Sequence, residues 1–153
     1  MTPDLQREVE SFASTILRRY FCDSDVEFLI STFESDIVWL GGGEAMQAEG
    51  AEEVARFFRV GAENMLACRM WDERYVTREL APGVYLCEGT SRLESVAPGT
   101  ALTMLQRITF VFRRDKHGAL KTVHIHNSMP FDALKSDELF PMTTAKEAFR
   151  RLQ

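Results

Sequence analysis

Hydrophobic and polar residues alternate with a period of two over much of the second half of the chain. The clearest case is the segment 106–131, where the alternation continues on both sides of a charged, glycine-containing turn. The apolar positions of this segment are Ile108, Phe110, Phe112, Val123 and Ile125. Alternation on both sides of a tight turn predicts a β-hairpin.

The predicted hairpin has two chemically different faces. Residues paired across an antiparallel ladder point to the same side of the sheet. If the apolar positions share one face, the other face carries Arg107, Thr109, Thr122, His124 and His126. A register shift of one residue would mix the two sets, and a half-buried sheet resists such a shift. We therefore expect one apolar face and one face with an arginine and two histidines.

The rest of the chain divides into helical and extended patterns. Apolar residues at helical spacing predict helices over 3–21, 26–33 and 51–65. Extended patterns predict strands over 36–40, 70–80, 84–93 and 103–113, before the closing strand. The order helix, helix, strand, helix and then a meander of four strands predicts an α+β fold, in which helices cover one face of a single curved antiparallel sheet.

Composition narrows the class of protein. The chain has 153 residues and a formal net charge of −5, which favours one domain and argues against nucleic acid or an anionic membrane as a partner. No apolar run approaches the roughly 18 residues of a membrane-spanning helix, and the polar N-terminus is unlike a secretory signal. Three widely spaced cysteines indicate free thiols rather than a disulfide framework. We expect a cytoplasmic protein without a cofactor.

The order of elements and the closing run from Thr122 to Ser128 (TVHIHNS) resemble the nuclear transport factor 2-like superfamily, and more narrowly its SnoaL-like branch. The segment from Phe112 to Ser128 is also similar to the last hairpin of the association domain of calcium/calmodulin-dependent protein kinase II. The resemblance implies a cone, in which a strongly curved antiparallel sheet wraps around three helices from the N-terminal half and leaves a pocket. It also implies a homodimer formed through sheet surfaces.

The same resemblance divides the chain at residue 131. Residues 1–131 are predicted to form the cone. Residues 132–153 are predicted to form a tail of the same domain, with Leu134, Leu139 and Phe140 as anchors and a short terminal helix that begins near Thr143.

The polar face of the hairpin supplies the first candidate site. Arg107 can hold a carboxylate through its planar guanidinium group, and His126 and His124 can act as donors or bases near neutral pH. Trp39 and Tyr85 are candidates for aromatic walls of the pocket. The simpler interpretations are hydrogen bonds within the sheet or a subunit contact for the histidines, and a surface or interface salt bridge for Arg107. For Trp39 and Tyr85 the simpler interpretation is a place in the core or in an interface. A metal site is not predicted, because two histidines alone lack the third ligand that zinc or iron needs.

Three functions remain open. The first is a SnoaL-like small-molecule-binding domain whose pocket holds a polar or anionic organic ligand. The second is an enzyme of the cyclase, isomerase or dehydratase type that acts next to a carbonyl group, with His126 or Asp36 as the base. The third is a dimerising sensory or assembly module of a signalling system. The fold alone does not choose among these.

Overall fold

The computed structural model describes residues 1–99 and 103–130. Its elements, in chain order, are α1 (Pro3–Phe21), α2 (Val26–Ser31), β1 (Phe33–Leu40), β2 (Gln47–Glu49), α3 (Ala51–Asn64), β3 (Cys68–Ala81), β4 (Val84–Ser95), β5 (Thr103–Arg114) and β6 (Leu120–Ser128). The predicted anchors Leu134, Leu139 and Phe140, and the terminal helix from Thr143, lie outside the described residues.

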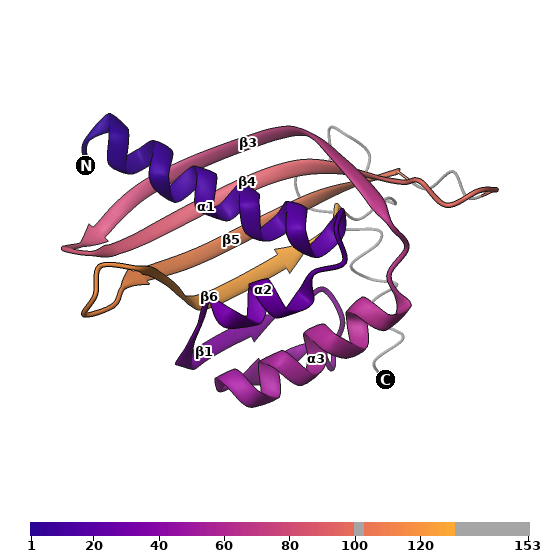
Figure 1. The fold of residues 1–153 in the computed structure, drawn as a ribbon, viewed down its shortest axis with the longest axis horizontal. Helices are drawn as coiled ribbons and strands as arrows, with labels where there is room; N and C mark the ends of the chain where they lie inside the picture. Colours follow the sequence, from indigo (N-terminus) through magenta and orange to yellow (C-terminus); the bar gives the residue numbers. More distant parts are fainter. Residues whose placement is uncertain (100–102, 131–153) are drawn as a thin grey trace, which may run out of the picture.

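The six strands form one curved sheet in the order β2-β1-β6-β5-β4-β3 (Figure 1). The last four strands form the predicted antiparallel meander. The prediction of a wholly antiparallel sheet was wrong in one place, because β1 runs parallel to β6. The three-residue strand β2 was also not predicted, since it is too short for an alternating pattern to show.

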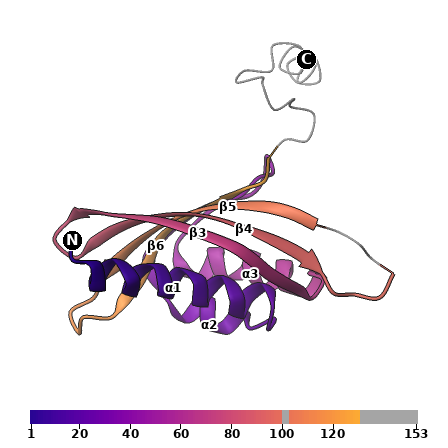
Figure 2. The same cartoon turned by 90° about the horizontal axis from the view of Figure 1, so that it is seen from above.

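All three helices of the described chain pack on the same face of the sheet (Figure 2). We call this the inner face and the opposite one the outer face. Helix α1 lies along β3 and β4, whereas α3 lies beside β1 (Figure 1). No described helix is both long and apolar enough to cross a membrane.

The helices begin where the sequence places capping residues. The Thr2 hydroxyl accepts a hydrogen bond from the Leu5 amide at 3.3 Å, and Pro3 occupies the first turn of α1. The Asp25 carboxylate caps α2 by accepting from the Phe28 amide at 3.0 Å. These caps satisfy amides that have no partner within the helix, so the local sequence fixes where α1 and α2 start.

The inner face of the β5–β6 hairpin forms the centre of the core. Phe110 and Phe112 stack on each other with ring centroids 5.0 Å apart, and both are almost fully buried. Ile125 on β6 pairs with Phe110 on the same face, as predicted. The core is therefore built on the face that the alternation identifies as apolar.

Thr122 of β6 lies on the opposite side from the one predicted. The strand register changes between the pairs Phe112–Thr122 and Val111–His124, so Val123 is an extra, bulged residue. The bulge places Thr122 on the inner face, where it is fully buried and its hydroxyl lies 2.8 Å from that of Thr32. That hydrogen bond satisfies a polar group in the core.

A second bulge reverses the alternation in β3. Asp72 has a φ of +51°, and the pairing with β4 is interrupted between Trp71 and Arg74. A strict alternation would place Trp71 on the same face as Glu73, but Trp71 lies on the outer side, where its ring contacts the guanidinium of Arg92. The bulge turns Glu73 inward, towards α1.

Candidate functional site

A cavity of about 170 Å³ lies between the inner face of the sheet and the three helices. Six of its fifteen lining residues are aromatic, namely Tyr20, Phe21, Trp39, Phe57, Phe58 and Phe110. An apolar protein cavity of about 150 Å³ is large enough to bind benzene. This cavity can therefore hold one aromatic ring with a small substituent.

The aromatic walls come from elements that are distant in sequence. Trp39 on β1 lies 5.3 Å from both Phe57 and Phe58 on α3, measured between ring centroids. Phe58 also contacts Tyr20 of α1 edge-to-face, with centroids 5.5 Å apart. Edge-to-face and tilted contacts of this kind add stability beyond the burial of area. The helical layer thus holds the rings around the cavity in fixed positions.

Two side-chain amides supply most of the polarity of the cavity. The indole Nε1 of Trp39 donates a hydrogen bond of 2.7 Å to Oδ1 of Asn127 on β6. The hydroxyl of Ser91 on β4 donates to Oε1 of Gln106 on β5 at 3.2 Å. Both amides line the cavity. Their oxygens are held by these two hydrogen bonds, and their nitrogens have no partner among residues 1–99 and 103–130.

Tyr20 is the one lining residue of the described chain with an ionisable side chain. Burial raises the pKa of its hydroxyl to about 12, so the group is neutral at physiological pH. A Cβ atom added at Gly61 would lie 3.1 Å from the Tyr20 hydroxyl oxygen. The absence of a side chain at Gly61 thus leaves room for the hydroxyl beside α3.

Gly41, the first of three glycines after β1, has a packing role at the edge of the cavity. A Cβ atom at Gly41 would lie 2.7 Å from the Trp39 ring and 2.8 Å from the side chain of Met46. The Gly41 amide donates to the Met46 carbonyl at 2.6 Å, which closes the loop. Close approach of the backbone to Trp39 and Met46 explains the glycine at position 41.

The predicted site residues Arg107, His126 and His124 lie on the outer face, not in this cavity. Arg107 pairs with Ser128, and Thr109 with His126, so Arg107 and His126 are diagonal neighbours on that face. They line a groove of about 380 Å³ that also includes Arg74, Glu88 and Thr90. The expected single site is therefore divided between two sides of the sheet, and a ligand role for the outer residues stays a prediction.

The two histidines differ in their surroundings. His126 is exposed, whereas His124 is half-buried beside Val38 and Val111, its partners on the two neighbouring strands. This burial lowers the pKa of His124, and the nearby His126 lowers it further. His124 is therefore held towards its neutral form.

Asp36 and Tyr85 are not brought together with Trp39. Asp36 is 62% exposed and its carboxylate lies 3.1 Å from the guanidinium of Arg113, so it does not occupy the apolar wall that a tuned base needs. Tyr85 is buried on the inner side of β4, where its ring lies under the guanidinium of Arg114. It does not line the cavity. Of the five residues predicted to bind a ligand, Trp39 alone lines the cavity.

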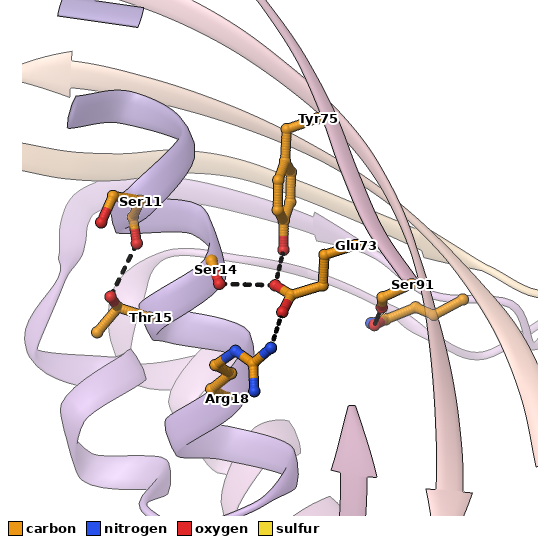
Figure 3. A network of polar contacts seen from close by, with 8 residues as sticks. Ser11, Ser14, Thr15, Arg18, Glu73, Tyr75 and Ser91 are labelled. Carbon is orange, nitrogen blue, oxygen red and sulfur yellow. Dashed lines mark hydrogen bonds and ion pairs between the residues drawn. The ribbon is translucent and has the colours of Figure 1, made fainter. Parts of the chain in front are cut away.

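A polar network joins α1 to the edge strand β3 (Figure 3). The Glu73 carboxylate accepts hydrogen bonds from the Ser14 hydroxyl at 2.6 Å and the Tyr75 hydroxyl at 2.8 Å, and it also pairs with Arg18. Burial, followed by the hydrogen bond to Glu73, raises the pKa of Tyr75. None of these residues lines the cavity, so the network positions α1 against the sheet.

Sequence reasoning missed Asn127 and Gln106, although a signal for Asn127 was present. A buried indole N–H usually donates a hydrogen bond, so a buried Trp39 predicts an acceptor beside its ring. Asn127 is two residues beyond Ile125, so it alternates in phase with the apolar face. Gln106 is likewise in phase with Ile108 and Phe110.

Comparison with solved structures identifies the fold as NTF2-like. An NTF2-like protein of unknown function from Pseudomonas putida KT2440 is 19% identical over 93% of this chain and 98% of its own, with a TM-score of 0.67. A candidate calcium/calmodulin-dependent protein kinase II association domain from Xanthomonas campestris is 16% identical over 83% and 89%, with a TM-score of 0.69. A candidate dehydratase of the NTF2-like family from Streptomyces avermitilis is 22% identical over 85% and 99%, with a TM-score of 0.67.

These comparisons confirm the predicted NTF2-like α+β fold. No protein-family profile matches the chain, and no curated protein matches it. The three similar structures have different functional descriptions, and all share less than a quarter of their residues with this chain. The likeness therefore establishes the fold, and function has to be argued from the site itself.

Proposed function

We propose that this protein is a small-molecule-binding domain whose ligand occupies the inner cavity. The observation that carries the proposal is the cavity of about 170 Å³ with six aromatic residues and two amides in its lining. Ligand sites in proteins are mostly apolar concavities with a few polar groups that fix orientation. The cavity matches that description in both respects.

The chemistry of the lining favours an uncharged ligand. None of the lining residues that the structure describes has a charged side chain. An anion buried there would lose its hydration without a counter-ion, which is costly. The anionic ligand expected from Arg107 and His126 would instead have to bind in the outer groove.

An enzyme that uses acid–base chemistry in this cavity is the weaker proposal. Such an enzyme needs a group that exchanges a proton near neutral pH. The described lining offers only Tyr20, whose pKa burial raises to about 12. The base candidates His126 and Asp36 lie outside the cavity. These positions favour binding over turnover.

The outer face supports a second proposal, contact between two copies of the chain in the cytoplasm. No described helix covers this face (Figure 2). A continuous row of half-buried residues crosses four of its strands, namely Val38, His124, Val111 and Leu86. A mainly apolar row on a face that no described helix covers favours association, which an assembly module would also use.

Sedimentation equilibrium tests this second proposal. We expect a dimer for the wild type and a monomer for Val111→Glu, because a carboxylate would be buried in the contact. Val60→Glu, on the exposed side of α3, is the matched control and should remain dimeric. A monomeric wild type would refute the proposal.

The cavity proposal can be tested with α-methylstyrene, an uncharged molecule with one aromatic ring. We expect saturable binding in NMR titrations of the full chain, with the largest shifts at residues around the cavity. Leu29→Phe should weaken binding about tenfold or more, because the larger side chain fills space that Leu29 borders. Val76→Phe on the exposed outer face is the control and should bind like the wild type. Absence of saturable binding would refute the proposed function.

A further inference from the structure

We propose that the ligand in the cavity is a neutral carbonyl compound, and that the side-chain amide nitrogens of Asn127 and Gln106 donate hydrogen bonds to its oxygen. This inference rests on the proposed function of the cavity and specifies the class of ligand. It follows from the direction in which each amide is held, and from the absence of charge in the described lining.

The orientation of Asn127 is set by Trp39. An indole nitrogen can only donate a hydrogen bond, so the group that it contacts at 2.7 Å has to be the amide oxygen. The amide NH₂ therefore occupies the other end of the Asn127 side chain. This assignment follows from hydrogen-bonding chemistry, which is the basis on which asparagine orientations are decided.

The side-chain oxygen of Gln106 also accepts a hydrogen bond, from Ser91 on the neighbouring strand. The Ser91 hydroxyl donates to Oε1 of Gln106 at 3.2 Å, and both side chains are at most 5% exposed. Ser91 and Gln106 are direct cross-strand partners, so the sheet itself maintains this contact. With the amide oxygen facing Ser91, the Gln106 NH₂ group is the free end of this amide.

The two NH₂ groups belong to one patch of the inner face. Asn127 pairs with Ile108, and Gln106 precedes Ile108 by two residues on the same face, so the amides are diagonal neighbours. Diagonal neighbours on a sheet are near enough for long side chains to meet. One carbonyl oxygen has two lone pairs and can accept from both nitrogens.

Neither nitrogen is used elsewhere in the described part of the chain. The hydrogen bonds of Asn127 and Gln106 side chains among described residues are the two accepted by their oxygens. Across the described residues, Thr77 Oγ1 is the one fully buried side-chain polar atom without a partner. The two nitrogens therefore remain accessible from the cavity. They can donate hydrogen bonds to a ligand that carries an acceptor atom.

The cavity also discriminates between a carbonyl and a carboxylate. Two neutral amides and the neutral Tyr20 hydroxyl can hydrogen-bond an oxygen, but they supply no positive charge. A carboxylate would lose more hydration than these donors return. We therefore expect a ketone, aldehyde, ester or amide on an apolar ring, in preference to an organic acid.

The test compares three probes of similar shape. Acetophenone carries a carbonyl, α-methylstyrene replaces its oxygen with a methylene group, and benzoate carries a charge. In NMR titrations of the full chain, acetophenone should bind about tenfold tighter than α-methylstyrene, as expected for one to two added hydrogen bonds. Benzoate should bind more weakly than acetophenone. The side-chain NH₂ signals of Asn127 and Gln106 should shift with acetophenone but not with α-methylstyrene.

Asn127→Asp is the decisive variant. An aspartate oxygen still accepts from Trp39 Nε1, but the donor to the ligand is lost. We expect the preference for acetophenone over α-methylstyrene to disappear. The carbonyl stretching frequency of bound acetophenone should be lowered in the wild type and return towards its non-hydrogen-bonded value in the variant. If Asn127→Asp does not fold, Gln106→Met provides the same comparison from the other amide.

The outcomes separate this inference from the function on which it rests. Equal affinities for acetophenone and α-methylstyrene, with unshifted NH₂ signals, would overturn the carbonyl inference and leave the binding function standing. Tighter binding of benzoate than of acetophenone would also overturn it. If none of the three probes binds, the proposed function fails, and the inference fails with it.

Discussion

Asn127 and His126 are neighbours in sequence but belong to two different chemical environments. Asn127 lines the inner cavity and is held by Trp39, whereas His126 lies exposed in the outer groove. The inner face of the same hairpin is closely packed, with Phe110 and Phe112 almost fully buried. The outer face carries Arg107 and His126 with no described helix over them.

The contrast shows how a polar group gains a defined role in this fold. On the inner face, each amide has one end held by a buried partner, so its remaining donor has a fixed direction. On the outer face, an exposed arginine or histidine can move and exchange its partners with water. Pre-organisation is what makes a polar group selective for a ligand. The inner face is therefore the stronger candidate site, although the outer face has more charge.

The largest expected effect comes from removing inner-face packing. Phe112→Ala should lower the free energy of unfolding by about 3–5 kcal/mol, because it leaves a cavity in a well-packed core. Thr109→Ala, three residues earlier on the outer face, should change it by less than about 0.5 kcal/mol. Urea denaturation of both variants provides the measurement. Similar losses for the two would contradict the assignment of faces.

A smaller loss of unfolding free energy is expected when Glu73, which the β3 bulge turns inward, is replaced. Glu73→Ala should cost about 2 kcal/mol, because the hydroxyls of Ser14 and Tyr75 lose a charged acceptor. Glu88 on the outer face pairs with Arg78 at 3.3 Å, and both side chains are about half exposed or more. Glu88→Ala should therefore cost less than about 1 kcal/mol.

The dependence of the unfolding free energy on salt concentration should distinguish Glu73 from Glu88. Raising the ionic strength should reduce the small contribution of the Glu88 pair, which solvent already screens. The contribution of Glu73 should persist, because two of its bonds come from neutral hydroxyls in a part-buried site. Equal sensitivity to salt would mean that Glu73 acts only as a surface charge, and the network would not then anchor α1.

The elements of this fold were predictable because their signals are local. Thr2 and Asp25 cap helices by contacts within three residues, and the alternation around Phe110 marks the inner face. The bulges at Asp72 and Val123 were not predictable in the same way. Each inserts one residue without changing the residue types around it, so a strict period of two continues in the sequence after it has ended in the structure.

The site was predicted less well, because its polar residues were chosen for their chemistry rather than for their phase. Arg107 and His126 are reactive residue types, but they alternate out of phase with Ile125 and Phe110. Trp39 alternates in phase with the buried Ile37, and both side chains lie on the inner face. By the same criterion Asn127, which alternates in phase with Ile125, belongs to the inner face. What the sequence could not show is that Asn127 and Trp39 meet, since 88 positions separate them in the chain.

The smallest expected effect tests how far the outer face is shielded from water. Burial lowers the pKa of His124, with a further contribution from His126, so the unfolded chain takes up a proton at a higher pH than the folded chain does. More protons bound in the unfolded state mean that stability rises with pH. The free energy of unfolding should therefore fall as the pH drops below about 6.5, the ordinary histidine value, and continue to fall until His124 is protonated in the folded state.

Comparison of histidine variants isolates this effect from the titration of carboxylates. His124→Gln should have a shallower dependence of unfolding free energy on pH between about 7 and 5 than the wild type, measured by urea denaturation at each pH. His117→Gln, in the exposed β5–β6 turn, should follow the wild type. If the outer face also joins two copies, the His124 effect should grow at protein concentrations where the dimer forms, because the contact would bury His124 further. An identical slope for all three proteins would show that water reaches His124 freely, and the row from Val38 to Leu86 would then be too open to serve as a contact surface.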